Sequence, residues 1–385
     1  MAFNALAAAQ MPPGEMSDQP ANVVPMQRTQ GPDQEQVQKL LGWMKSDNIA
    51  ADLDDETLNK MGELVKREFD IDENSRSEWK TKTEQAMDLA MQNAKEKQFP
   101  WPKAANVIYP MVTTASTQFA ARAYPAIVNG RSIVKGVVIG EDQGTPQIDP
   151  QTGQPVMQPG PPGPDGQSMP VPVWQTPPGA KRIKADQIGE HMSWQLLDEQ
   201  PEWEPETDQL LHLLPIVGCV FRKTYFDPGK GRNCSLMVSP MNFVVNYHAK
   251  SLETVPRTTE IIPYYPLEIE GMQRSGMFIE PKVPYGEAEN ADGDKDAPHE
   301  FLEQHRYWDL DEDGYAEPYI ITIHKQSSQV VRVVARYDAE GIHFNKNTHK
   351  IAKIDPVFYY TKYDFIPNPD GGFYAVGFGQ LLRPI

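Results

Sequence analysis

The chain changes its hydrophobic period near its middle, and this change limits the folds that are available to it. Up to about residue 216, apolar residues recur at three- and four-residue steps, the pattern of helices buried on one face. After Gly218, short runs such as 219–226 alternate and are rich in β-branched and aromatic residues, which is typical of strands. We therefore expect an α+β fold, with an N-terminal helical module followed by an antiparallel, β-rich module.

The helical half contains six segments with an apolar stripe. The clearest one begins at Ser75, where Ser75 and Glu78 form an S-x-x-E pattern that predicts a capped helix start. Prolines are expected to end this helix at Phe99-Pro-Trp-Pro102 and the next one at Tyr124-Pro125. The predicted helices cover residues 35–46, 55–69, 75–97, 108–123, 181–200 and about 205–216. The predicted strands cover 219–226, 234–246, 258–265, 300–309, 317–325, 329–337 and 356–363, with a helical insert at 266–274.

Proline marks the boundaries between parts of the chain. The 36 prolines are about twice the usual share of ~5%. Eleven of them fall among the 35 residues of 145–179, which predicts a poorly ordered surface insertion or linker. The expected organisation is a disordered arm at 1–33, a helical module at 34–130, a Pro-rich insertion at 131–180, helices at 181–216, a β-rich module at 217–365 and a final segment at 366–385.

Charge and cysteine content exclude several classes of function. With 53 acidic and 36 basic residues the net charge is −17, so tight, sequence-independent binding to DNA is not expected. Cys219 and Cys234 are too few for a disulfide framework and are expected to be reduced core thiols. Residues 1–10 lack the basic start of a signal peptide, and the densest apolar stretch, 210–221, is too short to cross a membrane. We expect a protein without a membrane partner that stays in the cytoplasm until it joins an assembly.

One motif has the form of a metal-binding loop. Asp309-Leu-Asp311-Glu-Asp313-Gly314 matches the opening of a calcium loop, D-x-D-x-D-G, in which carboxylates converge on a hard cation. The twelfth position, where a bidentate Glu should stand, is Ile320, and the flanking segments are predicted strands instead of helices. We favour an acidic hairpin turn without a metal, with a calcium loop as the alternative.

Three further patterns contain residue types that occur in functional sites. His299 and His305 flank two glutamates, but no third metal ligand is specified. Acids in the segment 202–206 could act as a carboxylate pair in glycoside hydrolysis, although acids are common at helix starts. A solvated helix face is favoured over a nucleic-acid patch for Lys80, Lys82, Lys95, Lys97 and Lys103. We therefore assign no catalytic, cofactor-binding or metal-binding residue, and expect neither a cofactor nor enzyme activity.

Aromatic residues provide the most specific expectation about packing. They cluster around the predicted helices at 75–97 and 108–123, together with a proline and an arginine. We expect the following residues to be structural anchors of the helical module: Trp79, Phe99, Trp101, Pro102, Tyr109, Phe119, Arg122 and Tyr124.

Three segments of the sequence resemble the portal proteins of short-tailed bacteriophages of the P22-like group. The most specific is 76–130, where the likeness lies in Arg76–Trp79, Phe99–Pro102, Asn106–Pro110 and Gln118–Pro125. The second and weaker segment is His305–His324, with its acidic turn. The third is Ile366-Pro-Asn-Pro-Asp-Gly-Gly372 followed by Gly377–Leu382.

The resemblance implies a structural protein of the virion, a head-to-tail connector that forms a homododecameric ring at one capsid vertex. Its partners would be other copies of itself, the terminase large subunit, the capsid protein, and tail or adaptor proteins. Duplex DNA would pass through its channel during packaging and ejection without specific binding. Residues 75–365 would form mainly the wing, with 217–365 as its β-rich part. Residues 366–385 would lead into the first stem helix, so that the chain corresponds to the N-terminal portion of a portal. Another virion protein, such as a minor head or adaptor protein, and a phage-associated hydrolase are the alternatives.

Overall fold

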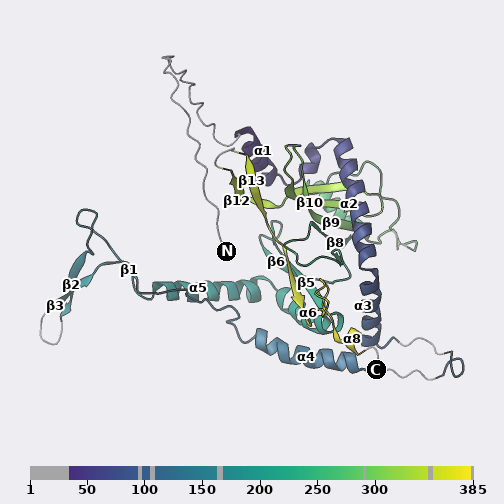
Figure 1. Ribbon diagram of the computed structural model, residues 1–385, viewed down its shortest axis with the longest axis horizontal. Coiled ribbons are helices and arrows are strands. Elements are labelled where there is room, and N and C mark those ends of the chain that lie inside the picture. Colours follow the sequence, from purple (N-terminus) through teal and green to yellow (C-terminus); the bar gives the residue numbers. More distant parts are fainter. Residues whose placement is uncertain are drawn as a thin grey trace, which may run out of the picture.

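The computed structural model describes residues 34–93, 98–104, 109–162, 168–288, 292–345 and 350–382. The arm predicted at 1–33 lies outside the described residues. Figure 1 shows a body of sheets and helices, with an arm that leaves it on one side. The predicted α+β class is confirmed, with helices dominating the N-terminal half and antiparallel sheets the C-terminal half.

A five-stranded antiparallel sheet forms the upper part of the body. Its strand order is β11 (Val330–Ala335), β10 (Glu317–His324), β9 (His299–Trp308), β8 (Arg257–Tyr264) and β7 (Phe243–Val244). One face packs against α1 (Gln34–Lys45), η1 (Ile49–Asp52) and α2 (Asp55–Ser75), whose apolar stripes meet alternate strand residues such as Tyr319 and Ile321. The opposite face packs against α7 (Pro266–Arg274) through residues such as Phe301.

A second, three-stranded sheet lies below the first. Its order is β14 (Tyr360–Asp364), β5 (Cys219–Asp227) and β6 (Arg232–Val238). A separate hairpin of β12 (Tyr337–Phe344) and β13 (Ile351–Pro356) packs into the same core as α1. Around it lie α3 (Ser77–Ala90), α4 (Met111–Ile127), α6 (Trp203–Val217) and the short α8 (Phe378–Leu381). Gly218 ends α6 with φ 95°, and a Cβ there would lie 2.4 Å from the Ala375 carbonyl oxygen, so the close turn into β5 requires glycine. A stem helix at 366–385 stays a prediction, because α8 has only four residues.

Several predicted boundaries are wrong. Ser75 ends α2 and does not cap α3, because its hydroxyl donates to the Asp72 carbonyl oxygen and accepts from the Tyr247 amide instead. Helix α3 ends at Ala90, well before the prolines that were expected to end it. Helix α4 passes through Pro125, since a proline in the last turn breaks few hydrogen bonds.

The arm contains more regular structure than its composition suggested. It consists of α5 (Ala180–Trp194), the π-helical turn η2 (Gln195–Glu199) and two small antiparallel ribbons. The ribbons pair β1 (Thr145–Pro146) with β4 (Trp174–Thr176), and β2 (Met157–Pro162) with β3 (Ser168–Pro172). The described part of 145–179 thus contains short ribbons, and poor order of this insertion stays a prediction. Both strands of a two-stranded ribbon are edge strands, where a missing proline N–H need not interrupt the ladder.

Candidate functional site

The predicted anchors that belong to α3 and α4 pack into the body. Trp79 is 6% exposed, and its ring stacks on Tyr374 at a centroid distance of 4.1 Å, as expected of an anchor. Phe119 and Tyr124 are partly buried where α4 packs against α6. The Trp79 contact joins the helical half of the chain to its C-terminal segment.

The prediction is wrong for the anchors that follow α3. Phe99, Trp101 and Tyr109 are 84%, 64% and 76% exposed, and Pro102 is exposed as well. Helix α3 has ended at Ala90, and the segment 98–104 projects from the body (Figure 1). Its Phe99 and Trp101 side chains are therefore exposed. Arg122 is also exposed, on the outer side of α4.

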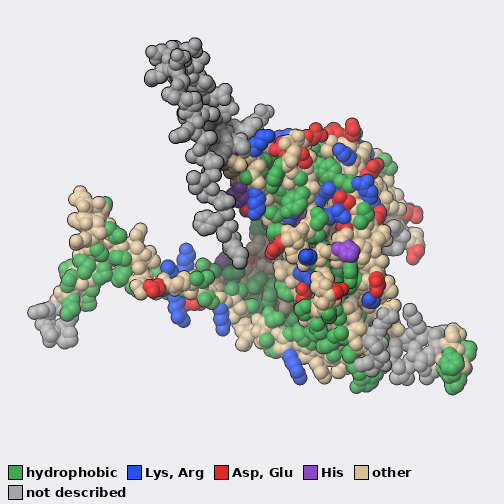
Figure 2. All heavy atoms as spheres, in the orientation of Figure 1, with side chains coloured by type: hydrophobic (Ala, Val, Ile, Leu, Met, Phe, Trp, Pro, Cys, Tyr) green, Lys and Arg blue, Asp and Glu red, His purple; other side chains and the backbone are tan. Residues whose placement is uncertain are grey.

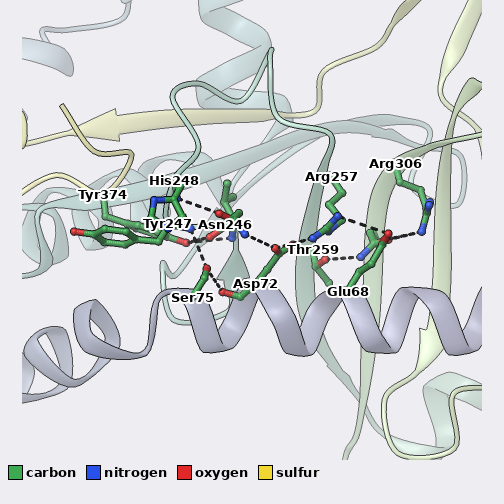
Figure 3. Close-up of polar contacts among 12 residues, drawn as sticks. Glu68, Asp72, Ser75, Asn246, Tyr247, His248, Arg257, Thr259, Arg306 and Tyr374 are labelled. Atoms are coloured by element: carbon green, nitrogen blue, oxygen red, sulfur yellow. Dashed lines mark hydrogen bonds and ion pairs between the residues drawn. The ribbon is translucent and has the colours of Figure 1, made fainter. Parts of the chain in front are cut away.

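A row of polar contacts fastens α2 to the loops and strands beside it (Figure 3). Arg306 donates to Glu68 at 2.7 Å, and Arg257 forms a bidentate pair with Asp72 at 2.8 and 2.9 Å. Asn246 donates a third hydrogen bond to Asp72, whose side chain is 1% exposed. Every one of these contacts joins residues more than 170 positions apart, so they fix the N-terminal helices to the C-terminal sheet.

A second cluster of buried charge lies between the two sheets. Lys223 of β5 donates to Glu260 of β8 at 2.8 Å and to Glu303 of β9 at 2.7 Å. Tyr360 of β14 donates to Glu260 at 2.6 Å. Burial is the largest single influence and acts to raise the pKa of Glu303, but the charge of Lys223 and the neighbouring His305 together outweigh it, so the pKa is lowered. The cluster therefore keeps the Lys223 ammonium and the Glu303 carboxylate charged although both are buried.

His305 extends this cluster to the surface of a small pocket, which Tyr360, Arg257 and Arg336 also line. Its Nε2 lies 3.5 Å from Glu303 Oε1, too far for a strong hydrogen bond. Burial lowers the pKa of His305 to about 4 against the opposing effect of Glu303, with smaller contributions from Arg336 and Lys223. A neutral imidazole beside a carboxylate could in principle transfer a proton, but Glu303 is already paired with Lys223.

We expect His305 to make stability depend on pH. Its folded pKa lies below the ordinary value of 6.5, so the unfolded chain binds the extra proton and stability is lost as pH falls from 6.5 towards 4. Between pH 7 and pH 5 the loss should be about 2 kcal/mol in the free energy of unfolding, measured with urea. His305→Gln should abolish this pH-dependent loss of stability, whereas the same change at the half-exposed His212 should not. An identical pH profile for wild type and His305→Gln would contradict this assignment.

The other residues singled out in the sequence have structural partners. Glu202 forms a bidentate pair with Arg232 at 2.6 and 3.0 Å, Glu204 accepts from the Tyr124 hydroxyl, and Glu206 accepts from the Met237 amide. These acids therefore fix α6 to its neighbours and do not converge as a catalytic pair. Of the lysines, Lys80 and Lys82 pair with Glu73 and Glu78, and Lys95 and Lys97 lie outside the described residues.

The two histidines of β9 are not brought together. His299 Nδ1 lies 3.3 Å from His324 Nε2, while His305 lies six residues further along the strand, beside Glu303. Cys219 and Cys234 are buried free thiols, as expected, and burial raises the pKa of Cys219 to about 12. Among the described residues, no helix is both long and apolar enough to cross a bilayer.

The acidic turn predicted at 309–314 connects β9 to β10. Asp309 accepts from the amides of Asp313 at 3.1 Å and Gly314 at 2.9 Å, which folds the turn tightly. Carboxylate oxygens of Asp309, Asp311 and Glu317 lie within 4.8 Å of one another. Glu317, the first residue of β10, is fully buried, and no local sequence pattern connects it with this turn.

The sequence matches no model of a known protein family and no curated protein sequence. Membership of the portal family therefore stays a prediction that depends on the quoted motifs. Its functional consequences are taken up as a proposal below.

Proposed function

We propose that this chain is a structural subunit of a phage portal, a head-to-tail connector whose copies assemble into a dodecameric ring at a capsid vertex. In the virion it would contact the terminase large subunit, the capsid protein and tail proteins, and would let duplex DNA pass without specific binding. The observation that carries the proposal is that the chain exposes apolar residues on two separate projections. The quoted likeness in 76–130 supports it independently.

The first projection is the arm (Figure 2). Val137 and Ile139 are 81% and 93% exposed, and α5 exposes Ile183, Ile188 and Met192. The second projection is the segment 98–104, which carries the exposed Phe99 and Trp101. Exposed apolar groups of this kind are typical of surfaces that bind another protein.

The arrangement of the two projections favours a ring. They differ in sequence and leave the body on opposite sides (Figure 1). A two-fold dimer joins a patch to its own copy, whereas two unlike patches allow each subunit to hold the next one, which generates a ring when the rotation closes. A chain that supplies both halves of such a contact fits a connector subunit better than a hydrolase.

The mass of the protein in solution tests this proposal. Light scattering on this chain and on a version extended beyond Ile385 is expected to give a closed ring near twelve subunits for at least one of them. Phe99→Ser combined with Trp101→Ser should abolish the ring, with an unchanged melting temperature, because both rings are exposed in the single chain. Leu267→Ser, at an equally exposed apolar residue on α7, is the matched control and should leave assembly intact.

If both versions are monomers or dimers, the proposed ring is wrong, and an adaptor protein or a hydrolase is favoured instead. If the ring still forms after the double substitution, the proposed assembly stands, but the segment 98–104 is not part of its interface.

A further inference from the structure

The loop between β9 and β10 gathers negative charge around one point. It runs from Asp309 to Ala316, and carboxylate oxygens of Asp309, Asp311 and Glu317 lie within 4.8 Å of one another. In the part of the chain that the structure describes, no other set of three potential metal-binding side chains comes this close together. Like charges at such distances repel, so a proton or a cation bound there would stabilise the arrangement.

Glu317 provides a second and independent observation. Its side chain is fully buried, and its Oε1 has no hydrogen-bond partner. Its Oε2 has only long contacts, at 3.4 Å to the Leu310 amide and 3.5 Å to the Tyr319 hydroxyl. Burying a carboxylate that lacks full hydrogen bonding is costly, and its presence in a well-packed core calls for a ligand.

Asp311 shows the same deficit. Its buried Oδ1 has no hydrogen-bond partner either. Burial, followed by the charge of Asp313, raises the pKa of Asp311 although the charge of Lys39 acts against this. Burial and then the charge of Asp311 raise the pKa of Glu317 to about 7. Two unsatisfied carboxylate oxygens therefore belong to the same acidic group.

We propose that this loop binds one Ca²⁺ ion, with Asp309, Asp311 and Glu317 as its side-chain ligands. Calcium takes oxygen ligands at about 2.3–2.6 Å, so carboxylate oxygens that all lie within 4.8 Å of one another can reach a single ion. Magnesium usually keeps several waters and binds through one or two carboxylates, so a set of three protein carboxylates favours calcium. Backbone carbonyl groups and water would complete the six to eight ligands that calcium takes.

The missing glutamate at position twelve explains why the sequence analysis favoured a turn without a metal. The structure supplies a glutamate from a different position, since Glu317 is the ninth residue of the motif and begins β10. A strand that starts beside the loop can thus provide the carboxylate that a following helix would otherwise provide. The proposed site does not depend on the portal function.

Occupancy of the loop would stabilise the packing of α1. Tyr319, which follows Glu317 on β10, packs edge-to-face against Trp43 of α1 at a centroid distance of 6.2 Å. Leu310 and Tyr315 of the loop belong to the same apolar core as α1. An ion that fixes the loop therefore also fixes the surface on which α1 lies.

Calcium titration of the full chain, after removal of metals with EDTA, tests the proposal. Calorimetry with CaCl₂ is expected to show one saturable site per chain, and the melting temperature should rise by several degrees when the ion is in large excess over its dissociation constant. MgCl₂ should bind at least about tenfold more weakly. Glu317→Gln and Asp309→Asn should each weaken Ca²⁺ binding at least about tenfold. Asp294→Asn, in the exposed acidic turn at 292–296, is the matched control and should change nothing.

The Glu317→Gln variant also separates metal binding from a merely structural role. In EDTA it should melt at or above the temperature of the wild type, because the amide removes a buried negative charge. In CaCl₂ the order should reverse, because only the wild type gains from the ion. Absence of binding by the wild type, or binding retained by both variants, would overturn the proposal, and equal affinity for both ions would overturn the assignment to calcium.

Discussion

Replacing Lys223 by methionine is expected to lower the free energy of unfolding by about 3–5 kcal/mol. The ammonium is 14% exposed and sits between Glu260 and Glu303, which are 12% and 13% exposed. Methionine fills a similar volume but leaves two carboxylates facing each other without a cation. Removing one partner of a buried charge cluster costs much more than the net contribution of the intact cluster, because the remaining charges are desolvated and unpaired. Urea unfolding monitored by circular dichroism at neutral pH measures the loss.

Two further variants show whether the unpaired charge is the cause. Adding Glu260→Gln and Glu303→Gln to Lys223→Met should recover a large part of the lost stability, since no charge is then left buried. Lys230→Met is the matched control, because that lysine is 51% exposed and lies 3.8 Å from Asp227, so the expected change is within about 0.5 kcal/mol. A loss for Lys223→Met as small as that of the control would show that the cluster is not desolvated as described.

Arg76→Met is expected to cost a similar amount, about 3–5 kcal/mol, for a different reason. The Arg76 side chain is fully buried at the junction of α2 and α3. It donates to the carbonyl oxygens of Pro240, Met241 and Phe243 at 2.6, 2.8 and 3.1 Å. The variant leaves these acceptors buried without a donor, which urea unfolding should detect as a lower midpoint at an unchanged slope.

The neighbouring Lys80 provides the control for Arg76. Both side chains pair with Glu73, at 2.6 Å for Lys80 and 2.7 Å for Arg76, but Lys80 is 38% exposed and contacts no carbonyl group in the loop 240–243. Lys80→Met is therefore expected to cost no more than about 1 kcal/mol. Equal losses for the two variants would assign the effect to the Glu73 pair and not to the carbonyl contacts of Arg76.

Local patterns in the sequence were sufficient to predict most elements of the fold. The helical insert was expected at 266–274 and α7 spans Pro266–Arg274, because a proline at a helix start and an apolar stripe are local signals. The strand predicted at 317–325 corresponds to β10 in the same way. The S-x-x-E pattern at Ser75 failed because the local signal competed with a tertiary one, the hydrogen bond from the Tyr247 amide.

Burial of individual side chains could not be predicted as well. Trp79 and Trp101 are the same residue type near the same helix, yet one is buried and the other exposed, because the difference depends on which distant segment covers them. Lys223, Glu260 and Glu303 were missed for the same reason, since a charged residue in an alternating strand normally faces solvent. The only sequence pattern that pointed to these three residues is that β5, β8 and β9 each lack a fully apolar face towards the core.

The junction between α2 and α3 has a mechanical consequence. The two helices follow one another along the body with only Arg76 between them, whose φ of −101° and ψ of 8° depart from helical geometry (Figure 1). Such a break would ordinarily act as a hinge. Here the Arg76 guanidinium donates hydrogen bonds to three carbonyl groups of a loop beside the five-stranded sheet. These bonds restrict bending between α2 and α3. A force applied to α3 would therefore be transmitted through α2 to the five-stranded sheet.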